Sequence, residues 1–106
     1  MSDREPTTRL LNDAAAPLFT VGQVADILGV QQAFLRRLDA QDVVCPARSD
    51  GRQRRYSRND IDRLQTVMTL IDDGLTLNGV RRVLELQAEV AALKRELARE
   101  RASQLS

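Results

Sequence analysis

Apolar residues recur at helical spacing shortly after residue 19. Four of them fall on one helix face, at positions i, i+3, i+4 and i+7: Val21, Val24, Ala25 and Leu28. Thr20 and Gln23 form a capping box in front of this pattern, in which each side chain can bond the backbone N–H of the other residue. Gly29 is placed to end the helix. The pattern therefore predicts a short helix between Thr20 and Gly29.

A second apolar pattern follows almost at once. It comprises Phe34, Leu35 and Leu38, while the polar residues between and after them face outward: Arg36, Arg37 and Asp39. Two short helices separated by three or four residues that include a Gly form a helix-turn-helix. Helices this short are unstable alone, so we expect them to share a core with other elements.

A β-hairpin is predicted after the second helix. Val43 and Val44 are expected to begin its first strand, and Arg52 to Tyr56 forms an extended second strand. The turn-prone sequence Ser49-Asp50-Gly51 lies between them and places the tip of the hairpin around Asp50-Gly51.

Two further helices complete the pattern. Ser57-x-x-Asp60 resembles a capping box with Asp in place of Glu, and apolar residues then recur at steps of three, four and three: Ile61, Leu64, Met68 and Ile71. Gly74 is expected to end this third helix. Thr76 is expected to cap a fourth, which continues to about Ala102.

The fourth helix carries an apolar seam with heptad spacing. Its members step by three, four, three and four: Val83, Leu86, Val90, Leu93 and Leu97. The seam could fold back onto the third helix of the same chain. However, the domain is too small to cover a helix of some 25 residues, which would be about 38 Å long. Because an exposed apolar stripe of this length promotes aggregation, we expect a partner helix, with a second copy of the chain as the simplest partner.

Composition excludes several classes of protein. The 106 residues, of which 42% are hydrophobic and 3% aromatic, allow one domain with a modest aliphatic core. No apolar run is long enough for a membrane span, and no secretory leader is recognisable. With no His and one Cys, the chain offers neither an internal disulfide nor a zinc site, and Cys45 is expected to be a small buried residue. No catalytic combination is evident, so we expect no enzyme and no cofactor.

Charge is distributed unevenly although the net charge is only +1. Residues 48–58 hold five Arg and one Asp, a local balance of +4: Arg48, Arg52, Arg54, Arg55, Arg58 and Asp50. Such a hairpin could be a solvated loop. A loop serving solubility would normally mix in acidic residues, whereas arginines that follow one track can neutralise the phosphates of duplex DNA. The bias therefore favours double-stranded DNA as a partner.

Several stretches together resemble the MerR family of bacterial transcription regulators. They are "TVGQVADILGV" for the first helix, "FLRRLDAQDVVCPAR" for the second helix and the start of the wing, "GRQRRYSRNDIDRL" for the wing and third helix, and "DDGLTLNGVRRVLEL" for the start of the fourth. The C-terminal helix "LTLNGVRRVLELQAEVAALKREL" is most similar to the heat-shock repressor (HspR-like) branch. The resemblance covers positions 19 to about 98.

The resemblance implies a fold and a way of acting. The fold would be mainly α, with a winged helix-turn-helix and a two-stranded wing followed by a long dimerisation helix that pairs as an antiparallel coiled coil. The implied organisation is a flexible N-terminal tail (1–18), a DNA-binding domain (19–75), a coiled-coil helix (76–102) and a C-terminal tail (103–106). The chain would act in the bacterial cytoplasm, on the nucleoid when bound. It would be a homodimer on a pseudo-palindromic promoter site, without a ligand-sensing domain of its own.

The candidate DNA contacts lie at the start of the first helix, at and along the second helix, and on the wing: Thr20, Gln31, Gln32, Arg36, Arg37, Arg48, Arg52, Arg54, Arg55 and Tyr56. Arg36 and Arg37 could instead form surface ion pairs with Asp39 or Asp42. Tyr56 could buttress the wing from the core, with only its hydroxyl reaching a phosphate. The seam from Val83 to Leu97 supplies the candidate dimer contacts.

An alternative function comes from a different class of protein. Leu38 stands where the family usually has an aromatic residue, Phe34 where a small hydroxyl residue is usual, and Asp42 where Gly is usual. The winged domain could therefore be an adaptor that docks on another protein, such as a sigma factor or a chaperone, through Phe34 and Leu38. For the regulator itself, RNA polymerase and a chaperone are the further candidate partners.

Overall fold

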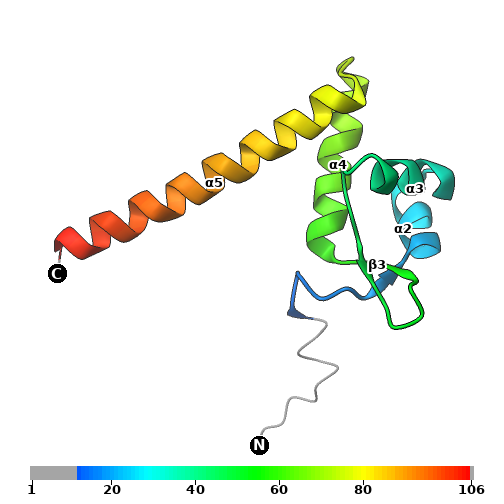
Figure 1. Ribbon diagram of the computed structural model, residues 1–106, viewed down its shortest axis with the longest axis horizontal. Coiled ribbons are helices and arrows are strands. Elements are labelled where there is room, and N and C mark those ends of the chain that lie inside the picture. Colours follow the sequence, from blue (N-terminus) through cyan, green and yellow to red (C-terminus); the bar gives the residue numbers. More distant parts are fainter. Residues whose placement is uncertain (1–11, 106) are drawn as a thin grey trace, which may run out of the picture.

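The computed structural model describes residues 12–105, and its elements are mainly helical (Figure 1). A small domain contains short helices, a three-stranded sheet and one longer helix, and a second long helix projects away from it. In chain order the elements are β1 (Phe19–Thr20), α2 (Val21–Leu28), α3 (Gln32–Ala40), β2 (Ala47–Arg48), β3 (Arg54–Tyr56), α4 (Arg58–Asp72) and α5 (Leu77–Leu105). The winged helix-turn-helix with a long C-terminal helix is confirmed.

The helix-turn-helix forms through the local signals expected of it. The Thr20 side chain accepts a hydrogen bond from the Gln23 backbone N–H, and the Gln23 side chain accepts one from the Thr20 N–H, which completes the capping box of α2. Gly29 ends α2 in the left-handed region with φ +68°, and the Val30 N–H bonds the Ala25 carbonyl across it. Only three residues then separate α2 from α3.

The wing differs from the sequence-based prediction in its strands. Val43 and Val44 do not begin a strand. Both are buried in the core, and the first strand of the wing is β2 at Ala47–Arg48. The sheet also has three strands rather than two, in the order β1-β3-β2, all antiparallel. Phe19 is opposite Tyr56 in the β1–β3 pair, so the residues just before α2 fasten one edge of the wing to the domain.

The wing turn lies where the sequence placed it. The Ser49 N–H bonds the Gln53 carbonyl at 2.8 Å, and the Arg52 N–H bonds the Ser49 carbonyl at 2.8 Å. Arg52, rather than the neighbouring Gly51, takes the left-handed conformation, with φ +63°. The turn therefore holds an arginine at the exposed tip of the wing.

Helix α4 begins and ends at the predicted signals. The Ser57 hydroxyl accepts a hydrogen bond from the Asp60 N–H, and the Asp60 carboxylate accepts one from the Ser57 N–H. Gly74, with φ +97°, reverses the chain after α4. The Thr76 hydroxyl accepts a hydrogen bond from the Gly79 N–H in the first turn of α5. Figure 1 shows α5 leaving the domain at this corner and extending well beyond it.

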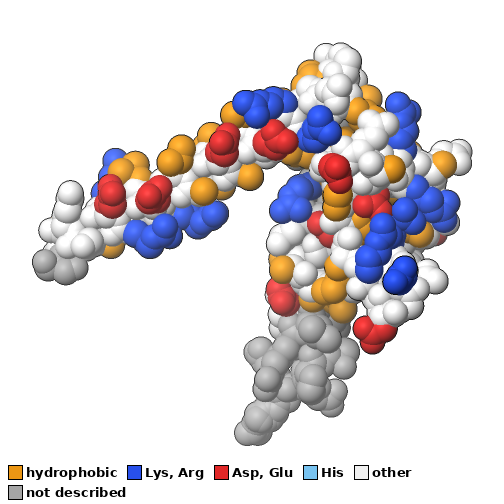
Figure 2. All heavy atoms as spheres, viewed as in Figure 1, with side chains coloured by type: hydrophobic (Ala, Val, Ile, Leu, Met, Phe, Trp, Pro, Cys, Tyr) orange, Lys and Arg blue, Asp and Glu red, His pale blue; other side chains and the backbone are white. Residues whose placement is uncertain are grey.

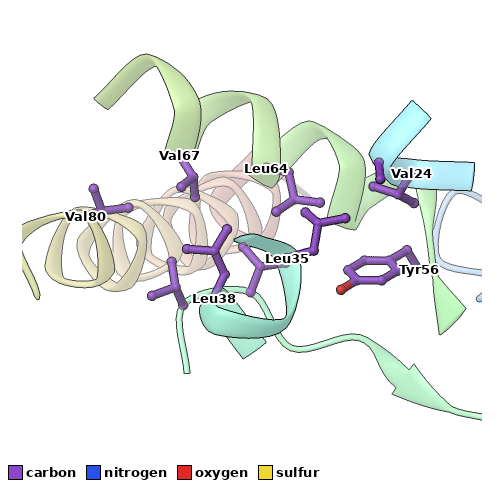
Figure 3. Packing of buried hydrophobic residues seen from close by; sticks show 10 residues of the cluster. Val24, Leu35, Leu38, Tyr56, Leu64, Val67 and Val80 are labelled. Carbon is purple, nitrogen blue, oxygen red and sulfur yellow. The ribbon is translucent and has the colours of Figure 1, made fainter. Parts of the chain in front are cut away.

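A mainly aliphatic core joins the helices to the wing (Figure 3). Its fully buried large side chains come from α2, α3, β3, α4 and the first turn of α5: Val24, Leu35, Leu38, Tyr56, Leu64, Val67 and Val80. Cys45 is exposed, so the expectation that it is buried is wrong: it lies between two buried residues, Val44 and Pro46, and its own side chain faces outward. The pKa of the Cys45 thiol is nevertheless raised by desolvation and by the nearby carboxylates of Asp39 and Asp42.

The segment before β1 lies against the start of α4. Residues 1–11 of the predicted N-terminal tail lie outside the described residues, as does Ser106 at the other end. Within the described part, the Asn59 N–H bonds the Ala14 carbonyl at 3.0 Å, and Ala16 is buried. The last residues of the predicted tail therefore pack on the domain.

Candidate nucleic-acid interface

The outer face of α3 is polar and basic. Gln31, Gln32, Arg36 and Arg37 are all exposed, because Leu35 and Leu38 face the core from the opposite side of the helix. Arg36 Nη2 donates a hydrogen bond to Gln32 Oε1 at 3.1 Å, one helical turn earlier. Among the described residues, neither Arg36 nor Arg37 has a carboxylate partner within salt-bridge distance. The alternative that these two arginines form surface ion pairs with Asp39 or Asp42 is therefore not observed.

Two arginines of the wing, Arg48 and Arg54, lie beside the last turn of α3, where both contact Asp39. Figure 2 shows Lys and Arg side chains gathered over the side of the domain that carries α3 and the wing. Arg52 is exposed at the wing turn. Arg55 is half-buried on β3, with its Nη1 donating to the Arg54 carbonyl at 3.1 Å. Helix and wing thus present one basic face to the outside.

Asp39 connects helix and wing, a role that sequence reasoning missed. Its Oδ2 accepts a hydrogen bond from Arg48 Nη2 on β2 and another from Arg54 Nε on β3, each at 2.7 Å. The side chains of Asp39, Arg48 and Arg54 are 10%, 45% and 27% exposed. The partners lie nine and fifteen residues from Asp39 in the chain, so no local spacing rule points to them.

Tyr56 is a core residue, and none of its side chain is exposed for the predicted DNA contact. The ring is fully buried and points toward Leu35 (Figure 3). Its hydroxyl is buried too and has no hydrogen-bond partner among the described residues. Burial raises the pKa of Tyr56, with the Asp39 carboxylate adding to the effect. The ring packs in the core as the buttressing alternative expects, but the hydroxyl is buried and does not reach the surface.

Thr20 caps the N-terminus of α2. It is half-buried, and its hydroxyl accepts the capping bond from the Gln23 N–H. The hydroxyl can still donate its own proton outward, since a hydroxyl has both donor and acceptor capacity.

The adaptor alternative requires an exposed apolar surface at Phe34 and Leu38, and the structure does not expose Leu38. Leu38 is fully buried between α3 and the rest of the core (Figure 3), and Phe34 is half-buried and packs against that core. A partner protein could not dock on Leu38 without opening the domain.

The apolar seam of α5 is exposed in the single chain. Leu86, Val90, Leu93 and Leu97 are between 44% and 62% exposed, and Val83 is half-buried where α5 leaves the domain. A surface groove of about 360 Å³ runs along this face between Val83 and Lys94. Figure 2 shows hydrophobic side chains along α5 with no other part of the described chain packed against its outer length. None of the described helices is both long and apolar enough to cross a membrane.

Comparison with known proteins identifies the family. The model of the MerR HTH family of regulatory proteins matches residues 19–87. The chain belongs to the MerR family. The match includes both helices of the helix-turn-helix, the wing, α4 and the beginning of α5, which are the elements that the sequence resemblance covered.

Individual MerR-type relatives agree with this assignment. The chain is 37% identical over 83 residues to a Streptomyces coelicolor protein named as the heat shock protein HspR, covering 77% of this chain and 55% of the relative. It is 35% identical over 85 residues to the HTH-type transcriptional regulator GlnR of Bacillus anthracis, covering 77% of this chain and 66% of the relative. The chain thus spans little more than half to two thirds of the length of these relatives.

A solved structure shares the fold. The MerR family regulator HiNmlR, described as lacking the sensor domain and bound to promoter DNA, superimposes with a TM-score of 0.60 at 20% identity. The match covers 76% of this chain and 82% of that one.

Proposed function

We propose that this MerR-family chain is a sequence-specific DNA-binding transcriptional regulator that acts as a homodimer on a pseudo-palindromic promoter site. The observation that carries the proposal is the exposed basic face formed by α3 and the wing. That face has the shape expected of a protein that inserts a helix into the major groove and lays a wing along the flanking backbone.

Each part of the face has its own task in this proposal. Arg36 and Arg37, with Gln31 and Gln32 at the helix start, lie on the exposed side of the helix that would enter the groove. An arginine there can make a two-pronged contact to guanine, which is worth about 1–3 kcal/mol of discrimination between bases. The arginines of the wing would neutralise phosphates: Arg48, Arg52, Arg54 and Arg55. The Thr20 hydroxyl is a further candidate phosphate contact.

The dimer part of the proposal rests on α5. Its exposed seam from Val83 to Leu97 needs a cover, and an antiparallel copy of the same helix supplies a matching one. Two copies would present two α3 helices to one duplex. A dimer with two-fold symmetry binds a DNA site whose two halves are related by the same symmetry, which is a pseudo-palindrome. At a promoter in the bacterial cytoplasm, RNA polymerase would be a neighbour, and a chaperone is a further candidate partner.

Titration of the chain against labelled duplexes tests the DNA-binding part of the proposal. We expect tight binding that weakens steeply as salt rises, because each neutralised phosphate releases a counterion. Binding to a partner protein through an apolar adaptor surface would not show this dependence.

Three arginine variants distinguish contacts to the DNA bases from contacts to the DNA backbone. Arg55→Ala should weaken binding to all duplexes to a similar extent, and Arg54→Ala should do the same. Arg36→Ala should chiefly reduce the preference for one sequence over another. Gel-shift titrations on a preferred and a scrambled duplex measure both effects. Equal affinity of the wild type and all three variants for both duplexes would reject the proposal.

A further inference from the structure

We infer that Asp39 is a positioning residue of the DNA interface: it holds Arg48 and Arg54 side by side and ties the wing to α3, so that both elements meet one duplex together. The inference rests on the proposed DNA binding and adds a part to it. Asp39 would act through the two arginines and would not touch DNA itself.

The geometry of the three side chains supports this role. A single carboxylate oxygen, Asp39 Oδ2, receives an N–H from each arginine at 2.7 Å. Asp39 is nearly buried, whereas Arg48 keeps almost half of its side chain exposed. Each guanidinium has five N–H groups, and the contact with Asp39 uses one of them. The remaining N–H groups are available to phosphate oxygens.

Electrostatics explains why the carboxylate is needed. Two guanidinium groups that contact the same oxygen lie close together, and like charges at that distance repel each other. The carboxylate between them offsets this repulsion and leaves a local charge of +1. Without Asp39, the two arginine side chains would separate and sample many rotamers.

Asp39 also links three elements that the chain connects only through loops. It lies in the last turn of α3, while Arg48 and Arg54 lie on the two wing strands β2 and β3. Two contact surfaces held at a fixed spacing bind one duplex more tightly than two that must be brought together at binding. The ion pairs therefore preorganise the interface.

The sign of the change in DNA affinity on removal of Asp39 distinguishes a positioning role from a simple effect of its charge. A carboxylate near DNA repels phosphates, so its removal should strengthen binding if charge alone mattered. A positioning carboxylate predicts the opposite sign. Asp50 offers a matched control, because it is exposed on the turn of the same wing and makes no ion pair with Arg48 or Arg54.

The experiment measures the affinity of the full chain for a fluorescein-labelled duplex of arbitrary sequence over a series of salt concentrations. We expect Asp39→Ala to bind roughly tenfold more weakly, since two arginines must then be ordered on binding. Its salt dependence should correspond to about one phosphate fewer. Asp50→Ala should bind as tightly as the wild type or more tightly. Asp39→Glu, which keeps the carboxylate, should restore most of the affinity.

Further readouts separate positioning from loss of fold. Circular dichroism checks that each variant keeps its helices, and Asp39→Asn, which preserves the shape of the side chain, replaces Asp39→Ala if the latter unfolds. Folded Asp39 variants that bind as tightly as the wild type, or more tightly, would overturn the inference alone. A wild-type chain that binds no duplex would overturn the proposed function, and this inference with it.

Discussion

At the scale of single residues, two polar groups beside the wing differ in their hydrogen bonding. The Asp39 carboxylate accepts from two arginines, whereas the Tyr56 hydroxyl has no hydrogen-bond partner among the described residues. A buried polar group without a partner costs free energy of folding, about 1–3 kcal/mol. Tyr56 thus stabilises the fold through the packing of its ring in the core, and its hydroxyl does not contribute.

Replacement of Tyr56 by Phe tests this view. We expect Tyr56→Phe to leave the free energy of unfolding unchanged or to raise it by about 1 kcal/mol, because an unpaired polar group is removed. Its affinity for DNA should be unchanged. Tyr56→Ala serves as the comparison and should cost about 3–5 kcal/mol, since it removes a core aromatic ring. Urea denaturation measures both. A clear loss of stability or of DNA affinity in Tyr56→Phe would show that the hydroxyl has a partner after all.

The residues of the interface could be predicted only in part. The arginine-rich hairpin and the exposed face of α3 are visible in the sequence because like charges cluster there, and helical spacing separates Arg36 from Leu35. The sequence could not show which arginines Asp39 engages, because those contacts form only when the wing folds back beside α3. Nor could it decide between the two alternatives for Tyr56, because the side that a strand residue faces depends on the register of the sheet.

At the scale of elements, the helices were predicted well and the strands poorly. Capping boxes at Thr20 and Ser57 and the glycines at 29 and 74 mark helix ends by local chemistry that does not depend on the rest of the fold. Strands β1 and β2 have two residues each, which is too short for an alternating pattern. Val43 and Val44 are apolar because they are buried in the core, and two adjacent β-branched residues give the same signal as the start of a strand.

Gly29 provides a test of the helix-turn-helix at this scale. Its φ is +68°, and an added Cβ would meet no atom within 4 Å, so any cost comes from the backbone conformation alone. We expect Gly29→Ala to destabilise the domain by about 1 kcal/mol, and Gly29→Asn by less, because Asn tolerates the left-handed region better. Thermal melting ranks the two variants. An equal or larger loss for Asn would mean that side-chain size, and not φ, governs this position.

At the scale of the whole molecule, α5 is the feature that the single chain leaves incomplete. Its first turns pack on the domain through Val80 and Leu84, and Arg81 donates a hydrogen bond to the Gln41 carbonyl at the end of α3. Beyond these turns the helix carries an exposed apolar seam. The domain of one chain therefore forms one basic face. The seam of α5 would bring a second chain, with its own basic face, into a dimer.

A charge placed in the seam tests the proposed dimer. Leu93→Glu should convert the dimer to a monomer and lower the affinity for a two-half-site duplex by about a hundredfold or more, because the advantage of two linked contacts is lost. Ala92→Glu introduces the same charge one residue away, outside the seam, and should remain a dimer. Analytical ultracentrifugation gives the mass of each. The dimer interface would lie elsewhere if Leu93→Glu sedimented as a dimer.

The most direct test of the central claim is recovery of the genomic DNA fragments that the chain binds, followed by sequencing. The proposed homodimer, with one α3 helix and one wing per copy, predicts that the enriched fragments lie at promoters and share an inverted repeat. The two halves of that repeat should be separated by a whole number of helical turns, center to center. Fragments no different in sequence from the input DNA, or enriched sites without an inverted repeat, would contradict it.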